Sequence, residues 1–174
     1  MSLAELLRKR GEYAEALALN RRAVQIYEES LGGDHPDLAS ALINLANLQI
    51  TTEDYEEARG GFARAIPMLE RSLGETHPEL AMALSNLAFI DVMTGHPVEA
   101  LPRAERAVAI FEGHAGEQTG EPDAHFCLAQ ALVAANGERA RARVEVERAR
   151  VGFIAAGAAK AVELAELEAW AAEQ

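Results

Sequence analysis

Apolar residues recur along the whole chain at steps of three and four, separated by short polar or glycine-containing turns. Such steps place the apolar side chains on one face of a helix. Asp34 is a candidate N-cap for the helix that begins at Pro36. Residues 2–10 read as the second half of a helix, and the further predicted helices cover 13–31, 36–52, 55–73, 78–94, 97–113 and 158–173.

The pattern returns after 42 residues. Ten residues between Gly32 and Ala46 recur unchanged between Gly74 and Ala88. A fixed period of this length is typical of a stacked repeat array, in which each unit buries its apolar face against its neighbours. The recurring residues are Gly32, His35, Pro36, Leu38, Ala39, Ala41, Leu42, Asn44, Leu45 and Ala46.

The chain is therefore predicted to form a single array over 1–174. Its parts are a truncated first repeat (1–31), a second repeat (32–73), a third (74–115), a degenerate fourth (116–157) and a C-terminal capping helix (158–174). The fourth repeat carries two extra residues. Pro122 precedes Leu128 by six residues, whereas Pro36 precedes Leu45 by nine, so its first helix is predicted to begin about one turn late.

Three residues oppose helix formation within the segment 55–73. Gly60 and Gly61 each disfavour a helix by about 1 kcal/mol relative to alanine. Pro67 removes an interior hydrogen bond. We expect this helix to persist, because packing of its apolar face outweighs propensity.

The formal net charge of −12 argues against a nucleic-acid-binding protein, which needs a basic face to meet phosphates. The charge fits a neutral or basic partner, or it serves solubility alone. The single cysteine, Cys127, excludes an internal disulfide. No apolar run approaches the roughly 20 residues that a bilayer requires, so no membrane contact is predicted and a cytoplasmic location is expected.

Short motifs near the predicted helix starts resemble the tetratricopeptide repeat. Its usual period is 34 residues, and the eight additional residues here resemble the kinesin light chain subclass. The resemblance implies an all-α, right-handed superhelical solenoid of antiparallel helical hairpins that binds other proteins. The motifs are Leu45-Ala46 and Leu87-Ala88, Tyr13-Ala14-Glu15-Ala16, Tyr55-Glu56-Glu57-Ala58, Val98-Glu99-Ala100, and the linkers 31–39 and 73–81.

In such an array the resemblance implies that first helices line the concave side. An amide donates and accepts at once, which suits Asn44 and Asn86 to the backbone of an extended peptide. Alternatively, these amides tie neighbouring helices together, and Met82, Phe89 and Met93 belong either to an apolar pocket or to the core. The predicted peptide-binding residues are Ser40, Asn44, Asn47, Met82, Asn86, Phe89, Met93 and Gln130.

No pattern in the sequence predicts catalysis. His35 and His77 lie one repeat apart in His-Pro linkers, where turn packing explains their recurrence. Cys127 lies among apolar residues and is expected to be a buried, inert thiol. The predicted protein is not an enzyme and uses no metal or cofactor.

Two hypotheses follow. In the first, the chain is a non-catalytic interaction module that holds a peptide or protein segment in a concave groove. In the second, it is a regulatory or assembly fragment of a larger multidomain protein. It then acts by end-to-end or domain packing, with self-association through apolar surface at the truncated N-terminal end.

Overall fold

The structure is a computed structural model that describes residues 3–31, 33, 35–114 and 120–174. These residues form helices and turns, and none of them lies in a strand. They divide into two compact units, Met1–Glu75 and Thr76–Gln174. Within the described residues, no helix is both long and apolar enough to cross a membrane.

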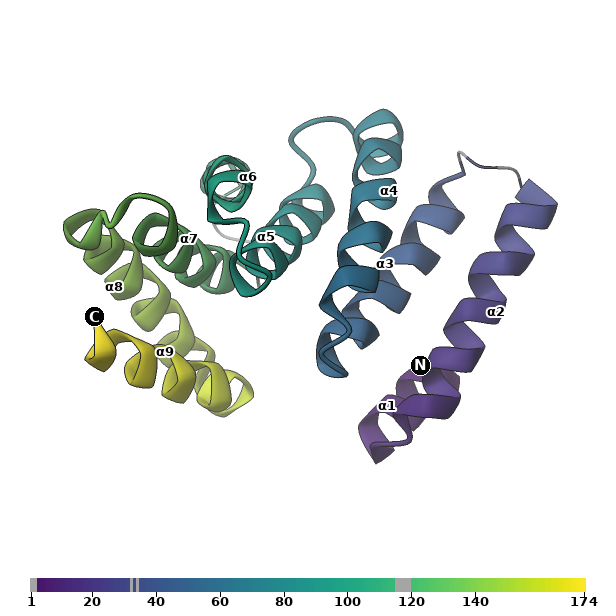
Figure 1. Cartoon of the computed structure of the whole chain (residues 1–174), viewed down its shortest axis with the longest axis horizontal. Coiled ribbons are helices and arrows are strands. Elements are labelled where there is room, and N and C mark those ends of the chain that lie inside the picture. The colour runs from purple at the N-terminus through teal and green to yellow at the C-terminus, as the bar shows by residue number, and fades with distance from the viewer. Residues whose placement is uncertain (1–2, 32, 34, 115–119) are drawn as a thin grey trace. The chain divides into compact units, whose positions relative to one another are not determined.

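The described residues of the first unit form four consecutive helices (Figure 1). Each helix packs against the next. Leu7 and Ala16 form a buried cluster with Leu48, which ties the first two helices to the third. The helices are α1 (Leu3–Arg10), α2 (Tyr13–Leu31), α3 (Pro36–Thr51) and α4 (Tyr55–Leu73).

The second unit continues the same pattern and ends in a helix that packs against its predecessor. In addition, α5 packs against α7, so the first helices of successive hairpins are in contact. A 3₁₀ turn over Gly157–Lys160 precedes the last helix. The helices are α5 (Pro78–Met93), α6 (Pro97–Glu112), α7 (Glu121–Asn136), α8 (Arg139–Ala156) and α9 (Ala161–Glu173).

The observed bounds agree with the predicted helices to within one or two residues, except that α9 begins after the 3₁₀ turn. This confirms the all-α fold of helical hairpins. Buried side chains recur every 42 residues, as the repeat requires. Examples are Ala16, Ala58, Ala100 and Ala142, and likewise Leu69, Phe111 and Phe153.

The predicted late start of the fourth repeat is wrong. Helix α7 has 16 residues, as α5 has, and begins at Glu121. Its buried positions follow those of α5 at a spacing of 44, so that Leu128 corresponds to Leu84. The two extra residues therefore shift the whole helix. The spacing of 42 is recovered at Arg139, which starts α8 as Pro97 starts α6.

The His-Pro linkers begin α3 and α5 in the same way. The Nδ1 atom of His35 accepts a hydrogen bond from the backbone N–H of Asp37 at 3.2 Å. The Nδ1 atom of His77 accepts one from Glu79 at 3.2 Å. Histidine is thus the N-cap, with proline in the first turn. Asp34, the predicted cap, lies outside the described residues.

Helix α4 continues through both glycines and through Pro67, as expected. The two glycines differ in their surroundings. A Cβ atom on Gly61 would lie 3.1 Å from the Cβ of Ala46 on α3, whereas one on Gly60 would meet nothing within 4 Å. Gly61 therefore permits the close approach of α3 and α4, while Gly60 only weakens the helix.

This difference predicts that alanine substitutions at the two glycines change the free energy of unfolding by different amounts. Gly60→Ala should raise the free energy of unfolding by about 0.5–1 kcal/mol, because alanine favours the helix and has room there. Gly61→Ala should raise the free energy of unfolding by less than Gly60→Ala does, or lower it, because the new methyl group crowds Ala46. Urea denaturation of both variants measures the difference. Equal gains would contradict a tight contact at Gly61.

Candidate functional site

In the first unit, three of the predicted binding residues lie on α3 with exposed side chains. Ser40, Asn44 and Asn47 follow one another at steps of four and three residues, which places them on one helical face. We call them the α3 polar face. The backbone carbonyl of Asn47 accepts a hydrogen bond from the Thr51 hydroxyl at 3.2 Å.

In the second unit, a pocket of about 410 Å³ lies among α5, α7, α8 and α9. We call it the α9 pocket. It brings together Asn86, Phe89, Met93 and Gln130, four of the predicted residues. Its full lining is Ser85, Asn86, Phe89, Met93, Asp123, Phe126, Cys127, Gln130, Phe153, Glu163, Glu166 and Trp170.

Met82 does not line the α9 pocket. Its side chain is 49 % exposed and lies beside Gly120. Gln130, by contrast, follows Asn86 by 44 residues, which is the spacing that relates the buried positions of α5 and α7. Amides therefore occupy equivalent places on two adjacent first helices.

Helix α9 supplies a wall of the pocket that sequence reasoning missed. Trp170 meets Phe126 of α7 edge to face, with ring centroids 5.8 Å apart and planes at 73°. Leu167 of α9 is fully buried. The sequence prediction took this segment as a capping helix, or as the first helix of an incomplete fifth repeat, and gave Trp170 no part in binding, although a lone tryptophan on an acidic helix was a usable signal.

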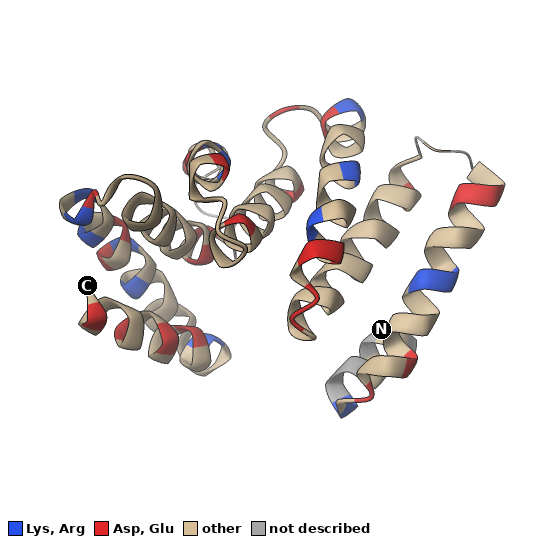
Figure 2. Ribbon diagram, viewed as in Figure 1, with Lys and Arg blue, Asp and Glu red and all other residues tan. Residues whose placement is uncertain are grey.

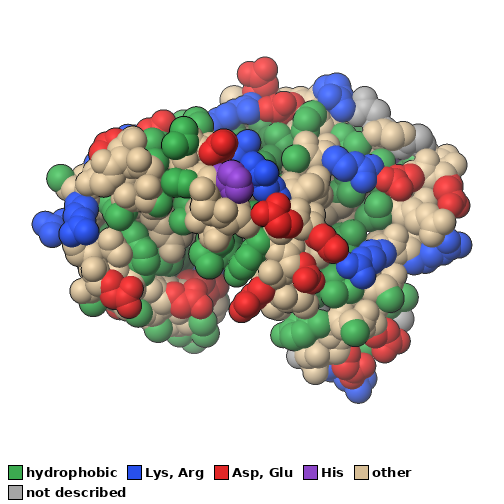
Figure 3. Space-filling view, viewed as in Figure 1, with side chains coloured by type: hydrophobic (Ala, Val, Ile, Leu, Met, Phe, Trp, Pro, Cys, Tyr) green, Lys and Arg blue, Asp and Glu red, His purple; other side chains and the backbone are tan. Residues whose placement is uncertain are grey.

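The polar rim of the α9 pocket is acidic. Lys160 Nζ donates to Asp123 at 2.8 Å and to Glu163 at 2.9 Å. Burial lowers the pKa of Lys160, but these hydrogen bonds raise it above its ordinary value. Figure 2 shows acidic residues along α9. In Figure 3 acidic and hydrophobic side chains lie next to one another over this helix, at the lower left.

Cys127 forms part of the pocket floor where α7 packs on α5. Its side chain is 5 % exposed, and its Sγ donates to the carbonyl of Ser85 at 3.3 Å. Burial, with the nearby charge of Asp91, raises the pKa of the Cys127 thiol to about 12 in spite of that hydrogen bond. Asp91 itself is fully buried and pairs with Arg103 of α6.

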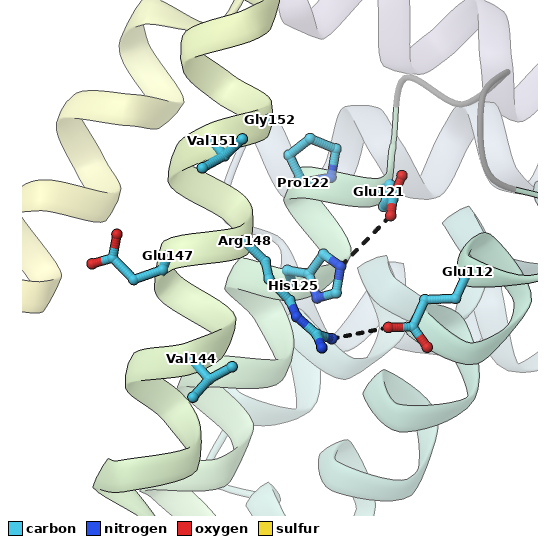
Figure 4. Close-up of a pocket in the computed structure, with 9 residues that line it drawn as sticks. All are labelled: Glu112, Glu121, Pro122, His125, Val144, Glu147, Arg148, Val151 and Gly152. Carbon is cyan, nitrogen blue, oxygen red and sulfur yellow. Dashed lines mark hydrogen bonds and ion pairs between the residues drawn. The ribbon is translucent and has the colours of Figure 1, made fainter.

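A second pocket, of about 740 Å³, lies among α6, α7 and α8 (Figure 4). We call it the α8 pocket. Gly152 of α8 lies so close to Pro122 of α7 that an added Cβ would be 2.3 Å from the ring. Its lining is Glu112, Glu121, Pro122, His125, Val144, Glu147, Arg148, Val151 and Gly152.

The charged groups at the α8 pocket pair with one another. His125 is buried, and its Nδ1 lies 2.7 Å from Glu145 Oε2. Its Nε2 lies 3.8 Å from Glu121 Oε1. Arg148 binds Glu112 at 2.9 Å. These paired polar groups tie three helices together, and the pairing leaves little for a charged ligand.

The comparisons agree with this fold. A sequence model of the tetratricopeptide repeat family matches residues 1–71 and 50–113. The comparison with curated proteins finds no match.

Among the described residues, no cluster of histidine, cysteine, aspartate and glutamate side chains could hold a metal ion.

Several crystal structures are similar to the chain. BtubC (BKLC) from P. vanneervenii has a TM-score of 0.77 and 24% identity, covering 90% of this chain and 62% of BtubC. The chain thus spans less than two thirds of the length of that protein. A kinesin light chain-like protein of Podosopora anserina with nearly identical TPR-like repeats has a TM-score of 0.74 and 24% identity. That match covers 86% of this chain and 71% of the other.

A variant of the Podosopora anserina protein gives a TM-score of 0.76 and 24% identity, over 95% of this chain and 81% of that one. At this identity the likeness shows the fold. The two Podosopora anserina structures are of a kinesin light chain-like repeat protein, in line with the predicted subclass.

We expect Cys127 to resist a thiol reagent in the folded protein. The reaction should stay slow as the pH rises through about 8.5, where an ordinary thiol ionises. A thiol whose pKa is about 12 keeps its proton over that range. Unfolding in urea should restore rapid labelling. Fast labelling of the folded protein, with the pH profile of an ordinary thiol, would contradict the buried position.

Proposed function

The chain belongs to the tetratricopeptide repeat family, and from that premise we propose that it is a non-catalytic module that binds a segment of a partner protein. Tetratricopeptide repeats in general mediate interactions between proteins. The choice of a peptide segment, and of the residues that contact it, is our own proposal. The proposal also includes a cytoplasmic location for the protein and a partner that is neutral or basic.

The α9 pocket is the observation that carries the proposal. It combines the amides of Asn86 and Gln130 with the apolar side chains of Phe89 and Met93. Binding pockets are usually concave and mostly apolar, with a few polar groups that orient the ligand. Here an apolar side chain of the partner would enter the pocket, and an amide would meet the adjacent peptide group.

The α3 polar face supports a second contact surface on the first unit. Ser40 and Asn44 are exposed, as is Asn47, on a helix whose opposite side is buried. Asparagine is a poor residue for the interior of a helix. We propose that these side chains, too, bind backbone groups of a partner segment.

Two single substitutions test these roles, one in each unit. Asn44→Ala and Asn86→Ala should each weaken the binding of those peptides, selected from a random decapeptide library, that contact the substituted residue, by about two- to tenfold. One lost hydrogen bond of about 0.5–1.5 kcal/mol accounts for each loss. Fluorescence anisotropy measures affinity, and circular dichroism checks that helicity is unchanged. Asn136→Ala, on an exposed residue at the end of α7, is the matched control.

If neither folded single variant loses affinity for any selected peptide, the proposed role of the two asparagines is overturned. A library from which the wild-type chain retains no peptide would overturn peptide binding itself.

A second candidate function, assembly through the N-terminal helices, is favoured by exposed apolar side chains on α1 and α2. Leu6 is 38 %, Leu19 36 % and Ile26 45 % exposed. Leu19 and Ile26 are seven residues apart and share a helical face.

Light scattering over a wide range of concentrations separates the two candidates. For an independent peptide-binding module we expect a constant monomer mass. A mass that rises with concentration, and that returns to the monomer value in Leu19→Ser with Ile26→Ser, would favour assembly instead.

A further inference from the structure

We propose that the α9 pocket selects a basic segment, in which a bulky apolar residue stands next to arginine or lysine. This inference rests on the proposed function and names the chemistry of the partner. The apolar residue would fill the pocket, and the cation would lie at its acidic rim.

The interior of the pocket is suited to a large apolar side chain. Three of the chain's five phenylalanines, together with its only tryptophan, line this single pocket. Met93 lines it as well and is 51 % exposed, and a flexible thioether adapts to differently shaped ligands. A volume of about 410 Å³ lies within the range of small ligand pockets.

Three carboxylates lie at the rim, and Lys160, which is not among the lining residues, pairs with two of them. Asp123, Glu163 and Glu166 line the pocket, and no arginine or lysine is among its lining residues. Within the described residues, the side chain of Glu166 takes part in no ion pair or hydrogen bond. Its carboxylate is thus available to a partner, one turn of α9 beyond Glu163.

The chain's own Lys160 shows which group this end of the pocket accommodates. Its ammonium bridges Asp123 and Glu163 and lies 5.9 Å from the centroid of the Phe153 ring. Carboxylates beside aromatic rings attract a cation through both charge and the ring quadrupole. A partner cation at Glu166 would meet the same kind of surroundings, with Trp170 four residues away on α9.

Charge also determines which segments are rejected. The chain has a net charge of −12, and an acidic segment would bring further negative charge to the rim. A partly enclosed site strengthens that repulsion relative to open solvent. Discrimination between a basic and an acidic segment therefore rests on repulsion as well as attraction.

The experiment selects decapeptides from a random library with the full chain. The peptides retained should be enriched in arginine or lysine beside a bulky apolar residue. The highest-affinity peptide is then compared with an analogue in which citrulline, a neutral group of the same shape, replaces arginine. If selection yields lysine, norleucine replaces it.

Glu166→Gln is the test variant, and Glu173→Gln, an exposed acid on the same helix outside the pocket, is the control. Glu166→Gln should weaken the basic peptide by about two- to fivefold, the effect of a partly exposed ion pair. It should leave the neutral analogue unaffected. The control should bind both peptides as the wild type does.

A further variant tests the apolar half of the pocket. Met93→Ser, at a half-exposed position where folding is not at risk, should weaken the basic peptide and its neutral analogue alike. Equal affinity of the wild type and this variant would show that the peptide lies elsewhere.

The possible failures are distinguishable. If no peptide is retained, the proposed function fails and this inference fails with it. If peptides are retained without basic residues, or if Glu166→Gln binds both peptides as the control does, the inference fails while the proposed function stands. Enrichment of acidic peptides would reverse the assignment of the partner.

Discussion

Close contact between neighbouring helices through very small side chains is the constraint on which the structure depends. Ala16, Ala58, Ala100 and Ala142 lie 42 residues apart near the start of successive second helices, and each is at most 3 % exposed. Helices packed at about 8–10 Å leave no room for larger groups at such points. At Gly61, which faces Ala46 of α3, even a methyl group would be crowded, so the contact favours glycine over alanine.

This constraint explains why so much of the fold could be predicted from the sequence. Each hairpin packs on its neighbours, so the pattern that repeats in the sequence is also the pattern of burial. Most helix bounds followed from the period, and the buried alanines and the large side chains at 69, 111 and 153 recur with it. The start of α7 did not, because inserted residues can shift a helix as a whole or only its beginning. The sequence of residues 114–121 does not distinguish these two outcomes.

The candidate site was predictable only where it belongs to the repeat. Asn86, Phe89, Met93 and Gln130 lie on first helices, and the period placed them on one face. Glu163 and Trp170 lie on α9, whose docking depends on contacts that occur once in the chain. The buried pair of His125 and Glu145 could not be predicted for the same reason. Its two residues lie 20 positions apart, and the pair occurs in only one of the described hairpins.

Two hairpins of the second unit each hold a buried carboxylate against a nitrogen group of the paired helix, and the carboxylate lies on the first helix in one hairpin and on the second helix in the other. Arg103 on α6 pairs with Asp91, and 42 residues later Glu145 on α8 pairs with His125. A misfolded hairpin of α5 with α8 would place Glu145 where Arg103 belongs, beside Asp91. Two buried carboxylates without a cation are strongly unfavourable. Chains built from near-copies are prone to such exchanges, and these charges make the wrong combination costly.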